Sequence, residues 1–391
     1  MSKPIYLDYN ATCPCDPRVV TAMMNSYSDT IGNASSSTHL YGWTAQHHVK
    51  KSREAVAELI GAKESQILFN SGATEANNAI LTAVAQHYQN EGCHIITSQI
   101  EHKCILQCCS YLESLGCELS YLPVNSDGHI CLDHLDQYLR PNTRLLSIMA
   151  ANNETGVIQN IDLCSKWAKK HGILFHTDAA QLIGKVPFNI QHFSIDFMSF
   201  SSHKFYGPKG IGAIYAKDFS LLIEHPFIWG GTQEYGARSG TLNVQGIVGF
   251  AEAARIAKAE LSDESKRISR MKESFVSMIH KSIPNLIYNG NITDTLPGSL
   301  NFYIPNIASK DLLSLLRRDL AISTGSACTS ATQEPSHVLR AMGLSDEECK
   351  SSLRLSFGRY TREEDLEDVV RYLVNALQKL SPSHYNNRKC A

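Results

Sequence analysis

The chain has 391 residues, of which 43% are hydrophobic and 19% are charged, a balance typical of globular proteins. This length exceeds the size at which one hydrophobic core usually stops growing, so we expect two domains. The formal net charge is −2 and the pI is near 6.8, which excludes a strongly basic surface for direct binding of nucleic acid or an anionic membrane.

The first residues lack the features of a targeting segment. Residues 1–17 contain no basic stretch followed by an apolar one, and no later uncharged run approaches the roughly 18 residues of a membrane span. The 12 cysteines are scattered along the chain, which favours reduced thiols over a disulfide framework. We therefore expect a cytoplasmic protein that does not associate with membranes.

Short apolar runs alternate with longer helical patterns through most of the chain. The predicted strands are 66–69, 94–97, 144–149, 173–176, 195–200 and 211–215. Among the helical patterns, one ends at Gly61, a residue suited to a left-handed C-cap, and another follows Val244. This alternation predicts an α/β fold with a mostly parallel sheet flanked by helices.

The composition changes after about residue 258, where lysine and glutamate become dense. Apolar residues at helical spacing predict a surface helix over 268–279, and 299–304 resembles a strand. Near the C-terminus, Thr361 and Glu364 predict a capping box at the start of an amphipathic helix.

These changes suggest the domain organisation. We predict a large domain over 16–258 and a smaller α+β domain formed by 1–15 together with 259–380. The polar residues 381–391 are predicted to form a mobile tail.

Lys204 stands at an unusual place for a lysine. An apolar strand runs into Ser201, Ser202, His203 and Lys204, just before a Gly-Pro turn. Because lysine is strongly hydrated and seldom buried, this position suggests an amine that its surroundings keep reactive, as in a Schiff-base lysine. The alternative is a solvated loop lysine.

Asp178 ends the preceding predicted strand. If the two strands are adjacent and parallel, Asp178 and Lys204 lie at the same edge of the sheet. A carboxylate in this position suits the pyridinium nitrogen of pyridoxal phosphate, whose protonation lets the ring accept electrons. A helix cap or a turn residue is the alternative interpretation.

Residues 70–77, NSGATEAN, place small and hydroxylated residues between a strand and a helical pattern. The N-terminus of such a helix can hold a phosphate with backbone N–H groups. The segment lacks the GxxxxGK[ST] spacing of a nucleotide-binding P-loop, so it indicates an anion site of another kind.

In order and spacing these segments resemble the fold-type I pyridoxal phosphate enzymes, and most closely the NifS/IscS-type cysteine desulfurases of the class V aminotransferase family. The resemblance spans nearly the whole chain. The matching motifs are LDYNAT (7–12), SGATEANN (71–78), EHK (101–103), NNETG (152–156), DAAQ (178–181), SSHKFYGPKGIG (201–212), RSGTLN (238–243), GSACTS (325–330) and LRLSFGR (353–359).

The resemblance implies a role for each matched residue. Lys204 would form the Schiff base with the cofactor, and His102 would stack on its ring and exchange protons. Asp178 would pair with the ring nitrogen and Gln181 with the phenolic oxygen. The other implied contacts are with the phosphate (Ala73, Thr74, Ser201, His203), with the phosphate of the neighbouring subunit of a homodimer (Thr241), with substrate and ring (Asn153), and with the substrate carboxylate (Arg354).

Without the flanking motifs, two of these residues have simpler interpretations. His102 lies among charged neighbours and would ordinarily be a surface residue. Arg354 would ordinarily be solvated or paired in a salt bridge.

Cys328 lies in STGSACTS, a segment of small and hydroxylated residues that suits an exposed loop rather than a packed core. A thiolate there could attack the sulfur of bound L-cysteine. The resemblance therefore implies conversion of L-cysteine to L-alanine, with sulfur held on Cys328 as a persulfide. An acceptor protein would then use the sulfur for iron–sulfur cluster assembly or for thiolation of nucleic acids.

Other cysteines depart from the family pattern. Cys13 and Cys15 form a CxC pair, and two thiols are too few for a structural zinc site unless other ligands join, so we interpret them as structural or incidental. Cys104, Cys108 and Cys109 have helical spacing and the same interpretation, while Cys390 is either a relay thiol or a tail residue.

The sequence is compatible with several functional alternatives. A class V aminotransferase or a selenocysteine lyase would share Lys204, Asp178 and Gln181, but transamination needs no thiol such as Cys328. An inactive scaffold that docks sulfur acceptors would be expected to have lost part of the site. A cysteine-ligated metal protein would bind zinc or iron in place of the cofactor.

Overall fold

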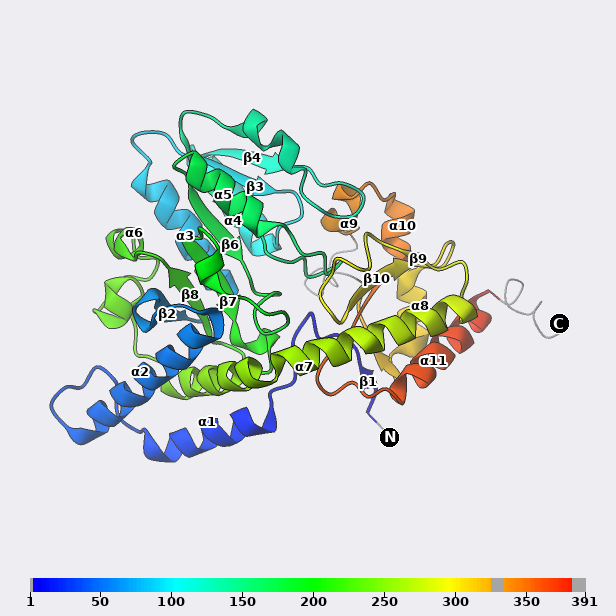
Figure 1. Ribbon diagram of the computed structural model, residues 1–391, viewed down its shortest axis with the longest axis horizontal. Coiled ribbons are helices and arrows are strands. Elements are labelled where there is room, and N and C mark those ends of the chain that lie inside the picture. The colour runs from blue at the N-terminus through cyan, green and yellow to red at the C-terminus, as the bar shows by residue number, and fades with distance from the viewer. Residues whose placement is uncertain (1–2, 325–333, 382–391) are drawn as a thin grey trace.

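The computed structural model describes residues 3–324 and 334–381 of the chain. They form a larger α/β body and a smaller α+β body, which are bridged by the long helix α7 (Val244–Ser282) and by the N-terminal segment (Figure 1). Among these residues, no helix is long and apolar enough to cross a membrane.

A seven-stranded sheet forms the centre of the larger body, in the order β2-β8-β7-β6-β5-β3-β4. β8 is antiparallel to both of its neighbours, and the other adjacent strands are parallel. The strands are β2 (Ile67–Asn70), β3 (His94–Ser98), β4 (Glu118–Leu122), β5 (Thr143–Ser147), β6 (Leu174–Asp178), β7 (Phe197–Ser201) and β8 (Gly212–Ala216). The mostly parallel sheet expected from the sequence is thus confirmed.

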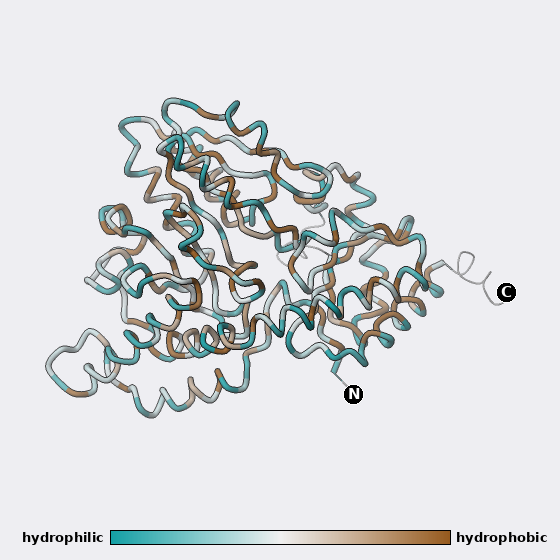
Figure 2. The backbone as a smooth tube through the Cα atoms, in the orientation of Figure 1, coloured by the Kyte–Doolittle hydropathy of each residue, from teal (hydrophilic) through white to brown (hydrophobic). Residues whose placement is uncertain are grey.

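Helices cover both faces of this sheet. They are α1 (Pro17–Asp29), α2 (Leu40–Ile60), α3 (Ala73–His87), α4 (Lys103–Ser114), α5 (Ile161–Lys170), α6 (Ser220–Glu224) and α7. Adjacent strand residues point to opposite faces, so Ile95 joins the apolar cluster of α3, α4 and α6, whereas Ile96 joins that of α1, α2, α5 and α7. Hydrophobic segments accordingly gather where the sheet meets the helices (Figure 2).

The smaller body has its own apolar cluster, built around the antiparallel sheet β12-β10-β9. Its elements are β9 (Ile287–Tyr288), β10 (Ser299–Tyr303), α8 (Ser309–Leu316), α9 (His337–Ala341), α10 (Asp346–Ser351), β12 (Ser352–Ser356) and α11 (Asp365–Leu380). The short strand β1 (Ile5–Tyr6) pairs in parallel with β11 (Leu320–Ala321), so the first residues of the chain join this body.

Helix α7 runs for 39 residues and crosses residue 258, so the predicted domain boundary falls inside a helix. No glycine or proline interrupts residues 250–282. Phe250 packs in a cluster of the larger body and Phe275 in that of the smaller one. The helix predicted over 268–279 is therefore the second half of a rod that passes through both bodies.

Short 3₁₀ helices complete the larger body: η1 (Glu64–Gln66), η2 (Leu132–Tyr138), η3 (Ile190–His192), η4 (Ser202–Lys204) and η5 (Gln233–Gly236). Gly61 caps α2 with φ 73°, as predicted. The predicted capping box is wrong, because α11 begins only at Asp365. The Thr361 hydroxyl instead accepts the N–H of Gly358 at 3.0 Å and closes the preceding turn.

Candidate active site

A cavity of ≈ 500 Å³ opens at the carboxyl ends of β6 and β7, beside the first turns of α3 and α4. Many of the predicted site residues line it, namely Ala73, Thr74, His102, Asn153, Asp178, Gln181, Ser201, His203 and Lys204. The parallel strands bring these residues together because their carboxyl ends meet at one edge of the sheet. Their individual roles remain predictions.

Lys204 closes η4, directly after β7. Its Nζ donates to the carbonyl oxygens of Asn10 at 2.8 Å and Ala11 at 2.9 Å. Both carbonyls belong to the N-terminal segment that leads out of the smaller body. The amine in the wall of the cavity is therefore held by backbone from the other end of the chain.

Asp178 is the last residue of β6 and lies opposite Ser199 of β7, as expected for adjacent parallel strands. Its side chain is buried, and its two oxygens accept the Asn77 side-chain amide at 2.7 Å and the Ala180 N–H at 2.9 Å. Each carboxylate oxygen keeps a further lone pair, so Asp178 can also accept a proton donor from the cavity.

The N-terminus of α3 forms one wall of the cavity. Gly72 caps it with φ 150° and has no side chain that could accept an N–H of the first turn. The first N–H groups of a helix also have no partner within the helix itself. The N–H of Ala73 donates to the Ser201 hydroxyl at 2.7 Å, which links this turn to the end of β7. Positive helix-dipole charge and N–H donors make this wall suitable for a phosphate group.

His102 caps the N-terminus of α4, and its Nδ1 accepts the N–H of Cys104 at 3.2 Å. The Cys104 thiol lies 3.0 Å from the same nitrogen. Burial, which outweighs the attraction of Asp178, lowers the pKa of His102, so the ring is neutral and its proton is assigned to Nε2. The interpretation of His102 as a surface residue is excluded by its position.

Cys104 lines the cavity, although its helical spacing had suggested an incidental thiol. Burial raises its pKa to about 12, so the group is a neutral thiol and a weak donor toward His102. Its two sequence companions, Cys108 and Cys109, are buried in the apolar cluster beneath α4. Of the three cysteines, only Cys104 lies in the first turn of α4, beside the cavity. Helical spacing alone could not distinguish it from Cys108 and Cys109.

His203 and Gln181 occupy two further parts of the wall. His203 Nδ1 lies 3.0 Å from the Thr12 hydroxyl, and burial, together with nearby Lys204, lowers its pKa to about 4. Gln181 Nε2 donates to the carbonyl of Asn10 at 2.9 Å. Both residues therefore present neutral hydrogen-bonding groups, and both contact the N-terminal segment.

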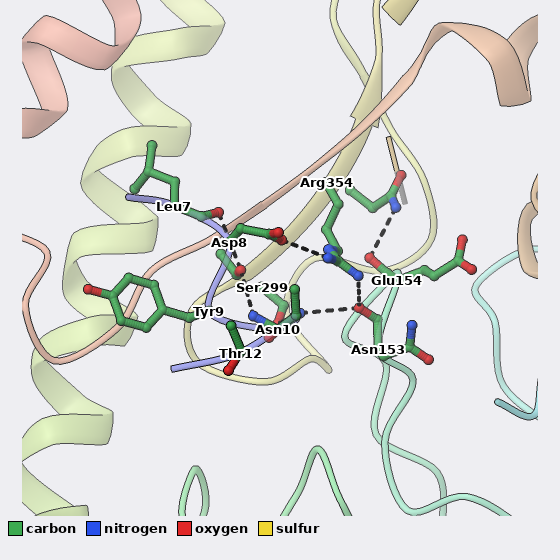
Figure 3. A network of polar contacts seen from close by, with 12 residues as sticks. Leu7, Asp8, Tyr9, Asn10, Thr12, Asn153, Glu154, Ser299 and Arg354 are labelled. Carbon is green, nitrogen blue, oxygen red and sulfur yellow. Dashed lines mark hydrogen bonds and ion pairs between the residues drawn. The ribbon is translucent and has the colours of Figure 1, made fainter. Parts of the chain in front are cut away.

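Arg354 lies in β12 and is 1% exposed, which excludes a solvated arginine. It does not line the cavity. Instead it donates to Asp8 at 2.6 Å and to the carbonyl of Asn153 at 3.0 Å, in the network drawn in Figure 3. Its Nε is buried and has no hydrogen-bond partner among the described residues. Asn153 therefore stands between the guanidinium and the open cavity.

Asn10 connects these groups, a function that sequence reasoning missed. It is buried. Its backbone N–H donates to the Ser356 hydroxyl at 2.9 Å, and its side-chain amide donates to the Ser299 hydroxyl at 2.8 Å. The motif LDYNAT supported only the resemblance, because the partners Ser299 and Ser356 lie 289 and 346 residues away in the chain. No local pattern could have indicated them.

Two predicted site residues remain to be considered. Thr241 is exposed, just before α7, and does not line the cavity of this chain. Cys328, like the tail residue Cys390, lies outside the described residues. Cys13 is buried with its thiol 3.1 Å from the carbonyl of Lys204, and Cys15 is partly exposed beside it in sequence.

The cavity can be tested for its fit to pyridoxal phosphate. That group requires an amine, a carboxylate for its ring nitrogen, donors for its phenolic oxygen, and an anion site for its phosphate. Lys204, Asp178, Gln181 and the first turn of α3 line one cavity and supply these four in turn. Its volume of ≈ 500 Å³ lies within the range of small-molecule sites, so the residues present fit the group.

Comparison with known proteins identifies the family. The model of the class-V aminotransferases matches residues 5–369. The chain belongs to the class-V aminotransferase family. Within the family it resembles the cysteine desulfurases IscS of Histophilus somni, with 46% identity, and of Mannheimia succiniciproducens, with 44%, each over 98% of this chain and 95% of the relative. The family resemblance predicted from the motifs is confirmed.

Solved structures agree with the assignment of this chain to the class-V aminotransferase family. A NifS-like protein is 37% identical with a TM-score of 0.90, over 96% of this chain and 100% of the other. A structure described as SspA in complex with cysteine is 36% identical with a TM-score of 0.81, over 92% and 100%. The predicted fold of a fold-type I pyridoxal phosphate enzyme is thus confirmed.

Proposed function

We propose that the protein is a cysteine desulfurase that uses pyridoxal phosphate to convert L-cysteine to L-alanine and transfers the sulfur to Cys328. The observation that carries this proposal is the cavity itself. It gathers an amine, a carboxylate, a neutral histidine and a helix N-terminus in a chain that is 44–46% identical to IscS relatives.

The proposed reaction balances without an external oxidant or reductant. The Cys328 thiolate attacks the sulfur of the substrate, an S–S bond forms, and the C–S bond breaks. The electron pair of that bond stays with the three-carbon fragment, which takes up a proton and leaves as alanine. One cysteine and one enzyme thiol therefore give one alanine and one persulfide.

When bound, pyridoxal phosphate would supply an electron sink for the pair left at Cα. Lys204 would anchor the group covalently and then move the Cα proton at Nζ, a task for which an amine close to two backbone carbonyls is well placed. Asp178 would hold the ring nitrogen in its protonated form, and the Asn77 amide keeps its carboxylate oriented. Ala73, Thr74, Ser201 and His203 would hold the phosphate.

His102 enters the reaction as a neutral ring with its proton on Nε2, because Nδ1 is occupied by the Cys104 N–H. It therefore acts first as a hydrogen-bond donor or general acid at Nε2. A ring in this tautomer cannot remove a proton at Nε2 until it has given up its own.

Arg354 would hold the substrate carboxylate, with Asn153 between it and the ring. In the described arrangement Asp8 occupies one guanidinium N–H and the Asn153 carbonyl another. The Nε–H has no partner among the described residues, and Nη1 and Nη2 each carry a second N–H. A carboxylate entering from the cavity would therefore find free N–H groups on the guanidinium once Asn153 moves aside.

The partners follow from the same proposal. A homodimer would bring Thr241 of each subunit to the phosphate of the other. A sulfur-acceptor protein, in iron–sulfur cluster assembly or in nucleic-acid thiolation, would remove the persulfide in the cytoplasm. Direct binding of nucleic acid by this chain is not part of the proposal.

The test compares wild type with Cys328→Ser and with a control, Cys131→Ser, which removes a partly exposed thiol that does not line the cavity. Each protein is incubated with L-cysteine and dithiothreitol, and alanine and sulfide are measured. We expect Cys328→Ser to retain the visible absorbance of bound cofactor but to lose both products by roughly two orders of magnitude or more. The control should match wild type.

Two outcomes would contradict the proposal. Alanine formation by Cys328→Ser at the wild-type rate would remove that thiol from the reaction. Formation of 3-mercaptopyruvate in place of alanine and sulfide by the wild type, with a 2-oxo acid supplied as amino acceptor, would favour an aminotransferase.

A further inference from the structure

A second lysine lies beneath the wall of the cavity. Lys185 follows Gly184, whose φ of 76° and close approach to Phe205 fix the turn after Gln181. The Lys185 Nζ donates to Gln181 Oε1 at 2.6 Å and to the side-chain oxygen of Asn10 at 3.0 Å. No role for this amine follows from the motifs or from the reaction described above.

These contacts determine which way the Gln181 amide faces. An ammonium nitrogen beside Gln181 can only donate, and a neutral amine would use both of its N–H groups on its two oxygen partners, so in either state the amide presents its oxygen to Lys185. Its nitrogen then points the opposite way and donates to the Asn10 carbonyl. If the amide were reversed, two N–H donors would face each other beside Lys185.

Gln181 and Lys204 share an acceptor. The Asn10 carbonyl receives Gln181 Nε2 at 2.9 Å and Lys204 Nζ at 2.8 Å. The N–H group that Lys185 selects is therefore delivered to the immediate neighbourhood of the reactive amine. An amide turned the other way would bring a carbonyl oxygen there.

The charges around Lys185 also connect it to the site. Burial lowers its pKa to about 7, with further lowering by Lys204 and Arg354 and an opposing effect of Cys13. Glu264 is the acidic side chain that shares a small cavity with it. Whether charged or neutral, the amine keeps at least two N–H groups, which is the number that its two acceptors require.

We propose that Lys185 is a positioning residue that locks the Gln181 amide so that its second N–H, the one not donated to Asn10, faces the phenolic oxygen of the cofactor. The proposal rests on the proposed function, because it requires pyridoxal phosphate in the cavity. A donor at this oxygen stabilises its anionic form, and an acceptor would destabilise it. With the cofactor bound, Lys185 would therefore influence the proton shared between the phenolic oxygen and Lys204 Nζ.

The test uses the full-length protein with its cofactor and the variant Lys185→Met, an unbranched side chain one atom shorter than lysine that has no N–H donor. The visible absorbance of the cofactor is titrated against pH, and the dissociation constant of pyridoxal phosphate is measured by adding it back to the apoprotein. We expect the pKa of the bound cofactor to rise by about one pH unit, because its anionic oxygen loses a donor. The affinity should fall roughly tenfold.

Lys272→Met is the matched control. Lys272 is also a buried amine, and it donates to Thr295 and to the carbonyls of Ile292 and Leu296 in the smaller body. Burial lowers its pKa to about 8. Both variants lose a buried, hydrogen-bonded amine, so general destabilisation should affect both, whereas only Lys185→Met should shift the cofactor titration.

Lys185→Gln retains one donor and gives a second measurement if the methionine variant folds poorly, with an expected shift between those of wild type and Lys185→Met. An unshifted titration in both Lys185 variants, or an equal shift in Lys272→Met, would overturn the role of Lys185 and leave the proposed function intact. A wild type that takes up no pyridoxal phosphate would refute both proposals.

Discussion

Glu101 precedes His102 and is fully buried. One of its oxygens accepts the Ser98 hydroxyl at 2.6 Å and the Met149 N–H at 2.9 Å, while the other has no partner among the described residues. Burial raises its pKa to about 8 from a usual value of 4.5. The folded protein therefore keeps this carboxyl protonated at a pH at which the unfolded chain does not.

This residue should make stability depend on pH. Because the folded state binds the extra proton between about pH 4.5 and pH 8, the free energy of unfolding should fall as pH rises through that interval. Glu101→Gln, which cannot ionise, should flatten this slope and be more stable than wild type at pH 8 by about 2 kcal/mol. Urea denaturation at several pH values measures the effect.

The exposed Glu113 provides the control. Glu113→Gln should retain the wild-type slope. A Glu101→Gln protein with that same slope would show that Glu101 is already ionised in the folded state at neutral pH.

Residues differ in how far the sequence reveals them. Lys204 and Asp178 could be predicted because each follows an apolar strand, and strand ends meet at one edge of a parallel sheet. Lys185 and Asn10 could not, because their roles depend on contacts with residues brought close only by the complete fold. Arg354 was assigned by resemblance, but its burial and its pairing with Asp8 required the structure.

At the scale of elements, the close approach of β8 to the first turn of α3 constrains the anion site. A Cβ at Gly212 would lie 2.6 Å from the Cα of Gly72 and 2.7 Å from the carbonyl oxygen of Phe200. Both neighbours are backbone and cannot rotate away. Gly212 therefore sets the distance between the sheet and the helix N-terminus.

Gly212→Ala should displace the turn at Gly72 and weaken the binding of pyridoxal phosphate roughly tenfold, because N–H donors would lose their alignment with the phosphate. Titration of the apoprotein with the cofactor measures this. Unchanged affinity together with unchanged thermal stability would mean that α3 moves as a unit without cost to the site.

The sequence predicted the end of a helix correctly where the end depends on a single residue, and incorrectly where it depends on contacts with other residues. Gly61 ended α2 as predicted, since a left-handed cap depends on one residue. The motif of Thr361 and Glu364 failed, because the threonine hydroxyl is engaged by Gly358. β4 was not predicted: it is a sheet-edge strand whose first residue is exposed, so its apolar signal is weak.

At the scale of the whole molecule, Arg359 links the two bodies. It pairs with Asp16 at 2.6 Å and with Glu264 at 2.7 Å, and its guanidinium lies 4.1 Å from the centre of the Tyr206 ring. Hydrogen bonds from Arg18, together with Arg359, hold the pKa of Asp16 well below its usual range. The stability that Asp16 contributes is therefore present above about pH 4 and is lost as the pH falls further.

Removing this arginine should loosen the connection between the bodies. Arg359→Leu leaves Glu264 without its arginine and Asp16 with only the half-exposed Arg18. We expect a loss of about 3 kcal/mol and two thermal transitions in place of one. Calorimetry tests this. Arg362→Leu, three residues later and largely exposed, should leave the transition unchanged, and a similar loss in both variants would contradict the proposed link.

The hydrogen bond between Asn10 and Ser356 also has a consequence for synthesis of the chain. Its partners are 346 residues apart, so a ribosome that adds about 5–20 residues per second needs roughly 20–70 s to produce the second after the first. Throughout that interval the N-terminal segment must remain without its final partners. The site is thus among the last features to form, and a nascent chain would capture its cofactor only near the end of translation.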